Sequence, residues 1–254
     1  MSTVRRMYAH RGLKSIAPEN TLSAFRLMPE HGVTWFETDV DILGDGTPVV
    51  LHDTLLDRTT NRQGSLYDLR ADDLDGIDAG SWFSSDFAGE PLPRLSQLID
   101  LMNELGLHAN IELKSHEQGK AGSLHQIEAV IEQLARLNPE REVIVSSFNH
   151  LLLDRMARRL EQEPELSRVQ VACLFHRAQL LPDWRSVMEM VGAQYAHLHN
   201  DGLTRQTVQQ FLDEGYVVNV WTVNEEDRAR TLFDWGVQGV MSDRAHKLMH
   251  LADE

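Results

Sequence analysis

The feature that most constrains the fold of this chain is the regular alternation of strand-like and helix-like segments along its sequence. Short apolar runs bounded by turn residues alternate with longer segments in which apolar residues recur at helical spacing. This alternation is typical of parallel sheets built from β-α units. The expected strands are Arg6–His10, Thr34–Asp41 continued by Pro48–His52, Ala109–Lys114, Val143–Phe148, Val169–Leu174, Tyr195–His199, Val217–Val223 and Gly239–Ser242. Eight strands with helical connections predict an α/β fold, the TIM (β/α)8 barrel.

Amphipathic segments between these strands predict the helices. Several of the segments are followed by a glycine, the residue that most often ends a helix in a left-handed conformation. The expected helices are Thr21–Glu30, Leu95–Leu105, Leu124–Leu137, Leu151–Glu161, Pro182–Val191, Arg205–Asp213 and Glu225–Trp235.

The stretch Asp53–Pro93 interrupts the alternation. It is rich in Asp, Gly, Ser and aromatic residues, and it is too long to be an ordinary connection between a strand and the next helix. We therefore expect one domain over residues 1–254, with a small inserted cap subdomain at about 53–93 after the second strand.

Charge and cysteine content exclude several classes of function. The chain has 24 Lys and Arg against 39 Asp and Glu, a formal charge of −15, which disfavours nucleic acid and anionic membranes as partners. The single cysteine, Cys173, has no partner for a disulfide within the chain, and this is typical of a reducing, cytoplasmic environment. The first seven residues contain no apolar signal segment, and no apolar run approaches the roughly 18 residues of a membrane span.

Ionisable residues gather where the expected strands end, which is the active-site face of a TIM barrel. The first strand ends in His10-Arg11-Gly12, and the second is followed by a turn and by His52. One histidine in such a position is usually structural. Two histidines with an arginine favour acid/base chemistry on an anionic substrate.

The second and third strands carry carboxylates on alternate positions, so that the side chains share one face. Glu37, Asp39 and Asp41 lie in the second strand, and Glu112 and Lys114 in the third. Buried carboxylates cost several kcal/mol each unless a cation, a proton or water compensates them. An all-oxygen ligand set favours Mg²⁺ or Ca²⁺ over zinc, and Lys114 can face a phosphate.

Two simpler interpretations compete with a catalytic site. Glu37, Asp39, Glu112 and Lys114 could form a buried ion-pair network that closes the end of the barrel. Trp221, at the end of the strand Val217–Val223, suits the packing of a core as well as it suits a substrate.

The same segments resemble the glycerophosphodiester phosphodiesterase family, in particular its small cytosolic bacterial members. The resemblance covers nearly the whole chain and rests on several motifs in the same order. These are AHRGLKSIAPENTLSAF at 9–25, FETDVDILGDGTPVVLHD at 36–53, LDRTTNRQG at 56–64, DAGSWF at 78–83, GEPLPRLSQ at 89–97, NIELK at 110–114, SSF at 146–148 and VWTVN at 220–224.

The resemblance implies a TIM barrel that hydrolyses glycerophosphodiesters, the deacylated phospholipid headgroups, to sn-glycerol 3-phosphate and an alcohol. It implies that His10 and His52 are the catalytic acid/base pair and that Glu37, Asp39 and Glu112 bind a divalent metal, Mg²⁺ or Ca²⁺. It also implies that Arg11 and Lys114 hold the phosphate, and we expect Trp221 to contact the substrate. Glu19 and Asn20 are expected to support the site, whereas Asp41 is left outside it.

Two rival functions remain. A related barrel phosphodiesterase could act on intact lipid, but the negative charge and the lack of a basic interfacial helix disfavour a membrane substrate. A non-catalytic binding barrel would be expected to have lost one histidine, and both are present. The sequence leaves open the preferred headgroup alcohol, the choice between Mg²⁺ and Ca²⁺, the histidine that acts first as a base, and whether the chain forms a homodimer.

Overall fold

A computed structural model describes residues 5–115 and 119–252 of the chain. Residues 1–4 and 253–254, at the two ends of the predicted domain, lie outside the described residues, and so do residues 116–118.

Eight parallel strands form a closed barrel. Each strand pairs with the next one around the ring, and the first strand also pairs with the last, so the sheet has no free edge within the barrel. The strands are β1 (Arg6–His10), β2 (Trp35–Ile42), β4 (His108–Leu113), β5 (Val143–Ser147), β6 (Gln170–Phe175), β7 (Tyr195–His199), β8 (Val217–Trp221) and β9 (Gly239–Ser242). The predicted TIM barrel is confirmed.

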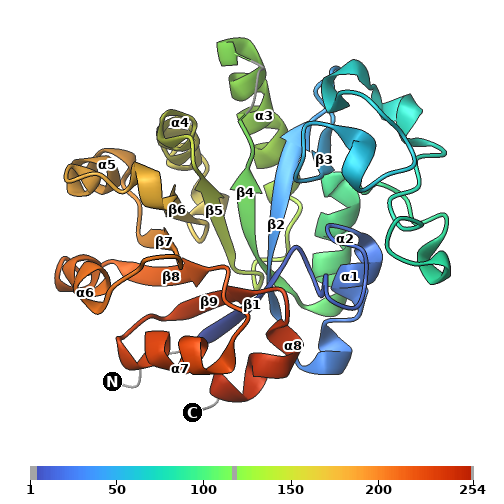
Figure 1. Cartoon of the computed structure of the whole chain (residues 1–254). Helices are drawn as coiled ribbons and strands as arrows, with labels where there is room; N and C mark the ends of the chain where they lie inside the picture. The colour runs from blue at the N-terminus through green and yellow to red at the C-terminus, as the bar shows by residue number, and fades with distance from the viewer. Residues whose placement is uncertain (1–4, 116–118, 253–254) are drawn as a thin grey trace.

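Helices surround the barrel and cover its outer face (Figure 1). Their bounds are α1 (Leu22–Arg26), α2 (Leu95–Leu105), α3 (Gly119–Leu134), α4 (His150–Leu160), α5 (Trp184–Val191), α6 (Arg205–Asp213), α7 (Glu226–Asp234) and α8 (Ala245–Leu248). The main core lies between the two layers and includes Phe25, Phe36 and Leu98, all with no exposed surface.

Two predicted helices differ from the structure by more than two residues at an end. The expected helix Thr21–Glu30 is shortened to α1, because Thr21 caps its first turn through a hydrogen bond from the Ala24 amide (3.3 Å) and Pro29 begins a separate 3₁₀ turn. The helix expected at Leu124–Leu137 is α3, which begins earlier, at Gly119. Its first residues include two glycines, which weaken the helical pattern in the sequence.

The second predicted strand is two separate strands. β3 (Pro48–Val50) runs antiparallel to β2, with Val50 opposite Val40, and is not part of the barrel ring. The chain reverses between them at a turn in which Gly46 has a φ of +89°, a conformation that favours glycine. His52 therefore lies in the loop after β3 and not at the end of a barrel strand.

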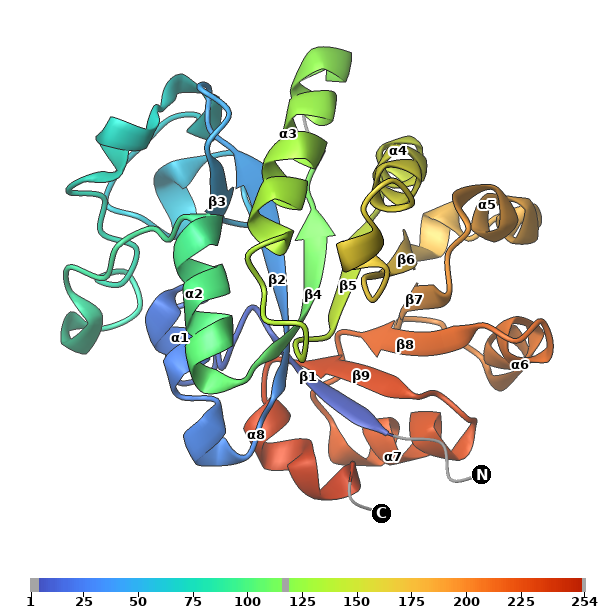
Figure 2. The same ribbon diagram turned by 180° about the vertical axis from the view of Figure 1, so that it is seen from behind.

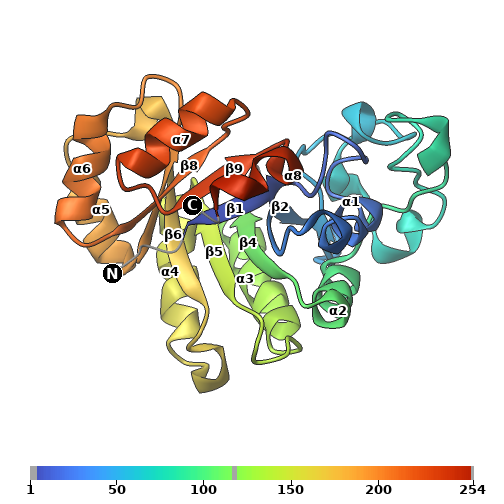
Figure 3. The same cartoon turned by 90° about the horizontal axis from the view of Figure 1, so that it is seen from below.

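Residues 51–93 form an irregular segment that packs around a cluster of its own. The segment contains four short 3₁₀ helices, at Leu56–Arg58, Leu66–Asp68, Ala71–Leu74 and Ser85–Phe87. Its buried apolar side chains, among them Leu56, Leu66 and Leu74, form a second cluster, which also includes Leu43 and Val49 of the β2–β3 hairpin and is separate from the main core. Figures 2 and 3 show this segment at the side of the barrel opposite α5 and α6. The interpretation of this segment as an inserted cap stays a prediction.

Among the described residues, none of the helices combines the length and the apolar character that crossing a lipid bilayer requires.

Candidate active site

The strand register brings three acidic side chains together at the carboxyl ends of β2 and β4. Asp39 lies opposite Glu112 in the parallel pair, and Glu37 is two residues earlier on the same face as Asp39. One carboxylate oxygen of each lies within 4.8 Å of the others, and Asp39 is only 1% exposed. Within the described part of the chain, no other group of acidic, histidine or cysteine residues is placed in this way.

Electrostatics favour a bound cation at these acids. Burial and the neighbouring Asp39 carboxylate raise the pKa of Glu37 well above its usual range. Burial likewise raises the pKa of Glu112 to about 7, even though Lys114 opposes the shift. Burial by itself would raise the pKa of Asp39. The positive charges of Lys114 and Arg11 outweigh burial and lower the pKa of that carboxyl. The pKa is thus raised for Glu37 and Glu112 and lowered for Asp39. The three carboxylates form an all-oxygen ligand set, which fits a hard divalent cation.

Two basic side chains flank the acids. Lys114 Nζ donates a hydrogen bond to Glu112 Oε1 at 2.8 Å and lies 3.4 Å from Asp39 Oδ1. Arg11 Nε lies 3.3 Å from Asp39 Oδ2, and the Arg11 backbone has a positive φ of 58°. The ion-pair interpretation is thus partly realised, since Lys114 and Arg11 do pair with acids. It leaves Glu37 without a Lys or Arg side chain as an ion-pair partner among the described residues, because its ion pair is with His10 and its other contact is the Arg11 backbone amide, which donates to Glu37 Oε2 at 3.2 Å.

His10 ends β1 and is oriented by a carboxylate from the other end of the chain. Its Nδ1 lies 2.6 Å from Asp243 Oδ1, and its Nε2 lies 3.8 Å from Glu37 Oε2. Asp243 is itself held by Lys14 Nζ at 3.1 Å and by Asn224 Nδ2, which donates to its second oxygen at 2.8 Å. A carboxylate on Nδ1 fixes that nitrogen as the donor and leaves Nε2 to exchange protons in the site.

His52 has the same arrangement, with a carboxylate that follows it directly in the sequence. Its Nδ1 lies 2.5 Å from Asp53 Oδ1, and Arg58 Nε donates to the other Asp53 oxygen at 2.5 Å. Burial opposes ionisation of Asp53, yet the Arg58 and His52 hydrogen bonds lower its pKa to about 2. Burial lowers the pKa of both His10 and His52 from the usual value of about 6.5, so both imidazoles favour the neutral form.

Two of the three acids, Glu37 and Glu112, and both histidines line one cavity of about 220 Å³. One wall is ionisable, with His10, Arg11, Glu37, His52 and Glu112. A second wall is formed mainly by apolar and aromatic side chains, and its residues are Phe148, Leu174, His176, Trp221 and Met241. Asn110 completes the lining. The cavity therefore has an ionisable wall for a phosphate and an apolar wall for a carbon skeleton.

The predicted site residues are thus brought to one place. Trp221 lies on the aromatic wall, with its ring 5.4 Å from that of Phe148. Asn20 donates to Asp39 Oδ2 at 3.0 Å, and Glu19 accepts from Arg11 NH1 at 2.9 Å. Asp41 accepts a hydrogen bond from the Tyr67 hydroxyl at 2.9 Å and is not part of the acidic group.

Sequence reasoning missed the residues that orient the histidines and some that line the cavity. Asp53 follows His52 directly, and Asp243 follows the last strand, so each had a positional signal as an acid at a strand or loop end. Arg58 and Phe148 lie in the motifs LDRTTNRQG and SSF but were given no role there, and His176 had no signal in the sequence. Their approach to the site depends on loop paths that periodicity does not determine.

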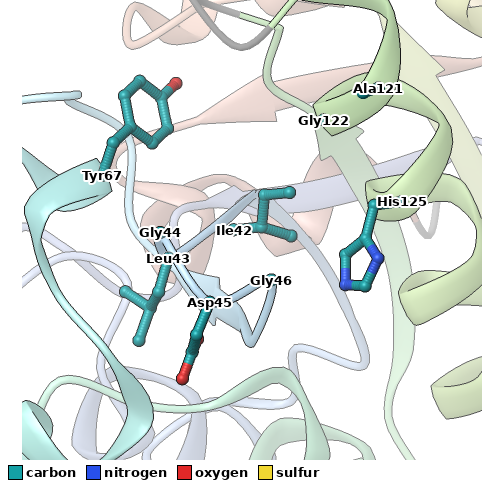
Figure 4. A pocket seen from close by; sticks show the side chains of 9 residues that line it. All are labelled: Ile42, Leu43, Gly44, Asp45, Gly46, Tyr67, Ala121, Gly122 and His125. Carbon is teal, nitrogen blue, oxygen red and sulfur yellow. The ribbon is translucent and has the colours of Figure 1, made fainter.

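A larger hollow of about 540 Å³ lies between the turn at Gly44–Gly46 and α3, and Figure 4 shows its lining residues. Asp45 projects from this turn, but its two carboxylate oxygens already accept hydrogen bonds from the amides of Thr47 (3.1 Å) and Ala71 (2.9 Å). The Tyr67 hydroxyl donates to Asp41. The ionisable groups of this hollow do not converge, so the smaller cavity is the better candidate for chemistry.

Comparisons with known proteins agree with this geometry. The family model described as the glycerophosphoryl diester phosphodiesterase family matches residues 10–247. A glycerophosphodiester phosphodiesterase of Caldanaerobacter subterraneus subsp. tengcongensis is 31% identical over 96% of both chains. The structure of an Oleispira antarctica phosphodiesterase in complex with the product sn-glycerol-3-phosphate has a TM-score of 0.90 and 31% identity, and the match covers 100% of this chain and 98% of that one.

More distant structures show the same fold. A putative glycerophosphoryl diester phosphodiesterase from Silicibacter pomeroyi has a TM-score of 0.84 at 24% identity and covers 100% of this chain. The family match spans the acidic group, both histidines and Asp243. The predicted family and enzyme class are confirmed: the chain belongs to the glycerophosphoryl diester phosphodiesterase family, a family of hydrolases.

Proposed function

We propose that His10 and His52 are the acid and base with which this glycerophosphodiester phosphodiesterase releases sn-glycerol 3-phosphate and an alcohol. One observation carries the proposal. Two histidines, each oriented at Nδ1 by a carboxylate, line the same cavity of about 220 Å³ as buried acids that can hold a cation. The product bound to the Oleispira antarctica phosphodiesterase is the product expected here.

Glu37, Asp39 and Glu112 are the residues that would hold a divalent metal, Mg²⁺ or Ca²⁺. When bound, such an ion supplies a Lewis acid that polarises phosphoryl oxygens and offsets the charge of the three carboxylates. The raised pKa of Glu37 supports this assignment, because a cation would favour the ionised form that burial disfavours.

Arg11 and Lys114 are proposed to hold the phosphate. Both are largely buried and remain charged, because acidic neighbours raise their pKa values although burial opposes this. They provide local positive charge in a protein whose net charge is −15. Trp221 is proposed to pack against the glycerol carbons on the aromatic wall.

In the proposed reaction the glycerol 2-hydroxyl attacks the phosphorus atom. One histidine takes the hydroxyl proton, a new bond joins the 2-oxygen to phosphorus, and the bond from phosphorus to the alcohol oxygen breaks. The second histidine donates a proton to the departing alcohol. This first step yields a cyclic 1,2-phosphate of glycerol, and the tethered nucleophile gains from proximity. The histidines then exchange roles: one takes a proton from water, whose oxygen bonds to phosphorus, while the bond from phosphorus to the 2-oxygen breaks and the other histidine returns a proton to that oxygen. The product is sn-glycerol 3-phosphate.

We further propose that the enzyme acts in the cytoplasm on water-soluble diesters. The lone cysteine, Cys173, is buried and unpaired, as is usual in reducing surroundings. The net charge of −15 disfavours approach to an anionic lipid surface, and so favours deacylated over intact lipid substrates.

The test is turnover of a panel of glycerophosphodiesters with choline, ethanolamine, glycerol and inositol headgroups. We expect release of glycerol phosphate that EDTA abolishes and that Mg²⁺ or Ca²⁺ restores, because the buried acids need a cation. Glu112→Gln should weaken metal binding in the same assay. Full activity in EDTA, with no metal detected by elemental analysis, would remove the metal from the account.

A further inference from the structure

Arg58 connects the partners of two residues of the candidate active site, His52 and Arg11. It lies in the short 3₁₀ helix Leu56–Arg58, and its side chain is 45% exposed. It is not among the residues that line the cavity. Arg58 nevertheless contacts the carboxylate partners of two residues that line the cavity, His52 and Arg11.

The first contact of Arg58 is with the carboxylate that orients His52. Arg58 Nε donates to Asp53 Oδ2 at 2.5 Å, while the other Asp53 oxygen lies 2.5 Å from His52 Nδ1. Asp53 therefore has one oxygen for the histidine and one for the arginine. This division holds the carboxylate in a single rotamer and fixes the direction of the imidazole.

The second contact of Arg58 is with the carboxylate that pairs with Arg11. Arg58 NH2 donates to Glu19 Oε1 at 2.8 Å, and NH1 donates to Glu19 Oε2 at 3.1 Å. Arg11 NH1 donates to the same Oε1 at 2.9 Å. Glu19 has a side chain only 9% exposed and is shared by two guanidinium groups.

The contacts of Arg58 with Glu19 and Asp53 affect the charge that an anionic substrate would meet in the cavity. Without Arg58, the charge of Glu19 would be offset by Arg11 alone, and Asp53 would retain a full negative charge beside the cavity. Both changes would oppose binding of a phosphodiester, because they reduce the net positive field at the phosphate.

We infer that Arg58 is a positioning residue that joins His52 to Arg11 through Asp53 and Glu19. This inference rests on the proposed function, since it assumes that His52 moves a proton and that Arg11 binds phosphate. The segment 51–93 thereby sets the relative placement of a catalytic group and a phosphate-binding group that come from different parts of the chain.

A guanidinium group is required for this role. Arg58 uses all three of its nitrogens on two carboxylates, and the planar fork matches both oxygens of Glu19. A lysine ammonium carries the same charge but is a single point, so it can hold only one of the two carboxylates in place.

The experiment measures kcat and KM for Arg58→Ala and Arg58→Lys, with Arg62→Ala as the matched control from the same segment. The Arg62 side chain is exposed and forms no hydrogen bond or ion pair with the described residues. We expect Arg58→Ala to lower kcat by on the order of 10- to 100-fold and to raise KM, the usual effect of losing a residue that positions a catalytic group. Arg58→Lys should restore either kcat or KM to near the wild-type value, but not both. Arg62→Ala should have the kcat and KM of the wild type.

Double mutants assign the two branches. In an Asp53→Asn background, Arg58→Ala should no longer lower kcat, and in a Glu19→Gln background it should no longer raise KM, because coupled residues show non-additive effects. Circular dichroism and Tm establish that each variant is folded, and Arg58→Gln replaces Arg58→Ala if the latter unfolds.

Several results would overturn the inference. These are additive losses in both backgrounds, coupling in only one of them, full recovery by Arg58→Lys, and wild-type kinetics in Arg58→Ala. Each of them leaves the proposed function intact as long as the wild-type chain cleaves the diesters. Failure of the wild-type chain on the whole headgroup panel would instead overturn the proposed function itself.

Discussion

At the scale of single residues, the two histidines owe their direction to carboxylates that the sequence places very differently. Asp53 is the next residue after His52, whereas Asp243 lies 233 residues from His10 and reaches it only because β9 pairs with β1. The grouping of His10 with the acidic triad could be predicted from strand-end position and alternation, whereas His52 lies in the loop after β3 and not at the strand end that the sequence predicted. The partner of His10 could not, because it depends on closure of the barrel.

The first prediction concerns Asp243. Asp243→Asn should keep the fold and lower kcat by on the order of 10²-fold or more, because an amide can stabilise the wrong tautomer of His10 and no longer favours its protonated form. Asp234→Asn, an exposed residue at the end of α7, is the matched control. Steady-state kinetics on one diester decide the matter, and equal kcat in the two variants would remove Asp243 from the catalytic group.

A second prediction concerns His197, which lies inside the barrel with no exposed surface. Burial lowers its pKa to about 3, from about 6.5 in the unfolded chain. Below pH 6.5 the unfolded state therefore binds a proton that the folded state does not, and stability falls as the pH drops from about 6.5 toward 3. His197→Gln should reduce this loss by up to about 1.4 kcal/mol per pH unit. Urea unfolding at pH 7, 6 and 5 measures the free energy of unfolding of the wild type and of His197→Gln. The same dependence of this free energy on pH in both proteins would contradict the prediction.

At the scale of elements, alternation located the barrel strands well but misread the hairpin of β2 and β3. Pro48–His52 has the apolar character of a strand, and the sequence pattern does not distinguish a continued barrel strand from a short antiparallel one. Helix ends were less predictable than helix positions, as α1 and α3 show, because capping and glycine content modify them. The path of residues 51–93 was not predictable, since its 3₁₀ turns have no regular period.

The third prediction tests whether this irregular segment is an inserted cap with its own core. Leu66 belongs to the second cluster and Leu98 to the main core, and both have no exposed surface. Each Leu→Ala change should cost about 2–5 kcal/mol where the surroundings do not relax. Hydrogen exchange should accelerate mainly within 53–93 for Leu66→Ala and throughout the barrel for Leu98→Ala. Identical exchange patterns would show one cooperative unit without a separate cap.

At the scale of the whole molecule, the closed ring brings together groups from the first and last parts of the chain. β1 contributes His10, β2 and β4 contribute the acids, and the turn after β9 contributes Asp243, while the loop after β3 supplies His52. The eight strands expected from the sequence predicted that the sheet closes into a barrel. The division of the cavity into an ionisable and an apolar wall followed only from the structure, because it depends on which strand ends face each other across the ring.

The acidic balance of the molecule also shows why local charge matters more than net charge. In a chain of −15, the site that we propose for an anionic diester is where Arg11 and Lys114 lie beside the acids of the proposed metal site. The proposed chemistry concentrates there, and it requires the substrate to carry its own nucleophile, the glycerol 2-hydroxyl.

The most direct measurement follows a glycerophosphodiester and its analogue without the 2-hydroxyl by phosphorus NMR with the metal-supplemented enzyme. The account predicts that the parent diester is converted to sn-glycerol 3-phosphate through a transient cyclic phosphate. The analogue should compete for the site, because it keeps the phosphate and its charge, yet be cleaved slowly. Hydrolysis of the analogue at the parent rate, with no cyclic species at any time, would contradict the account and indicate direct attack by water.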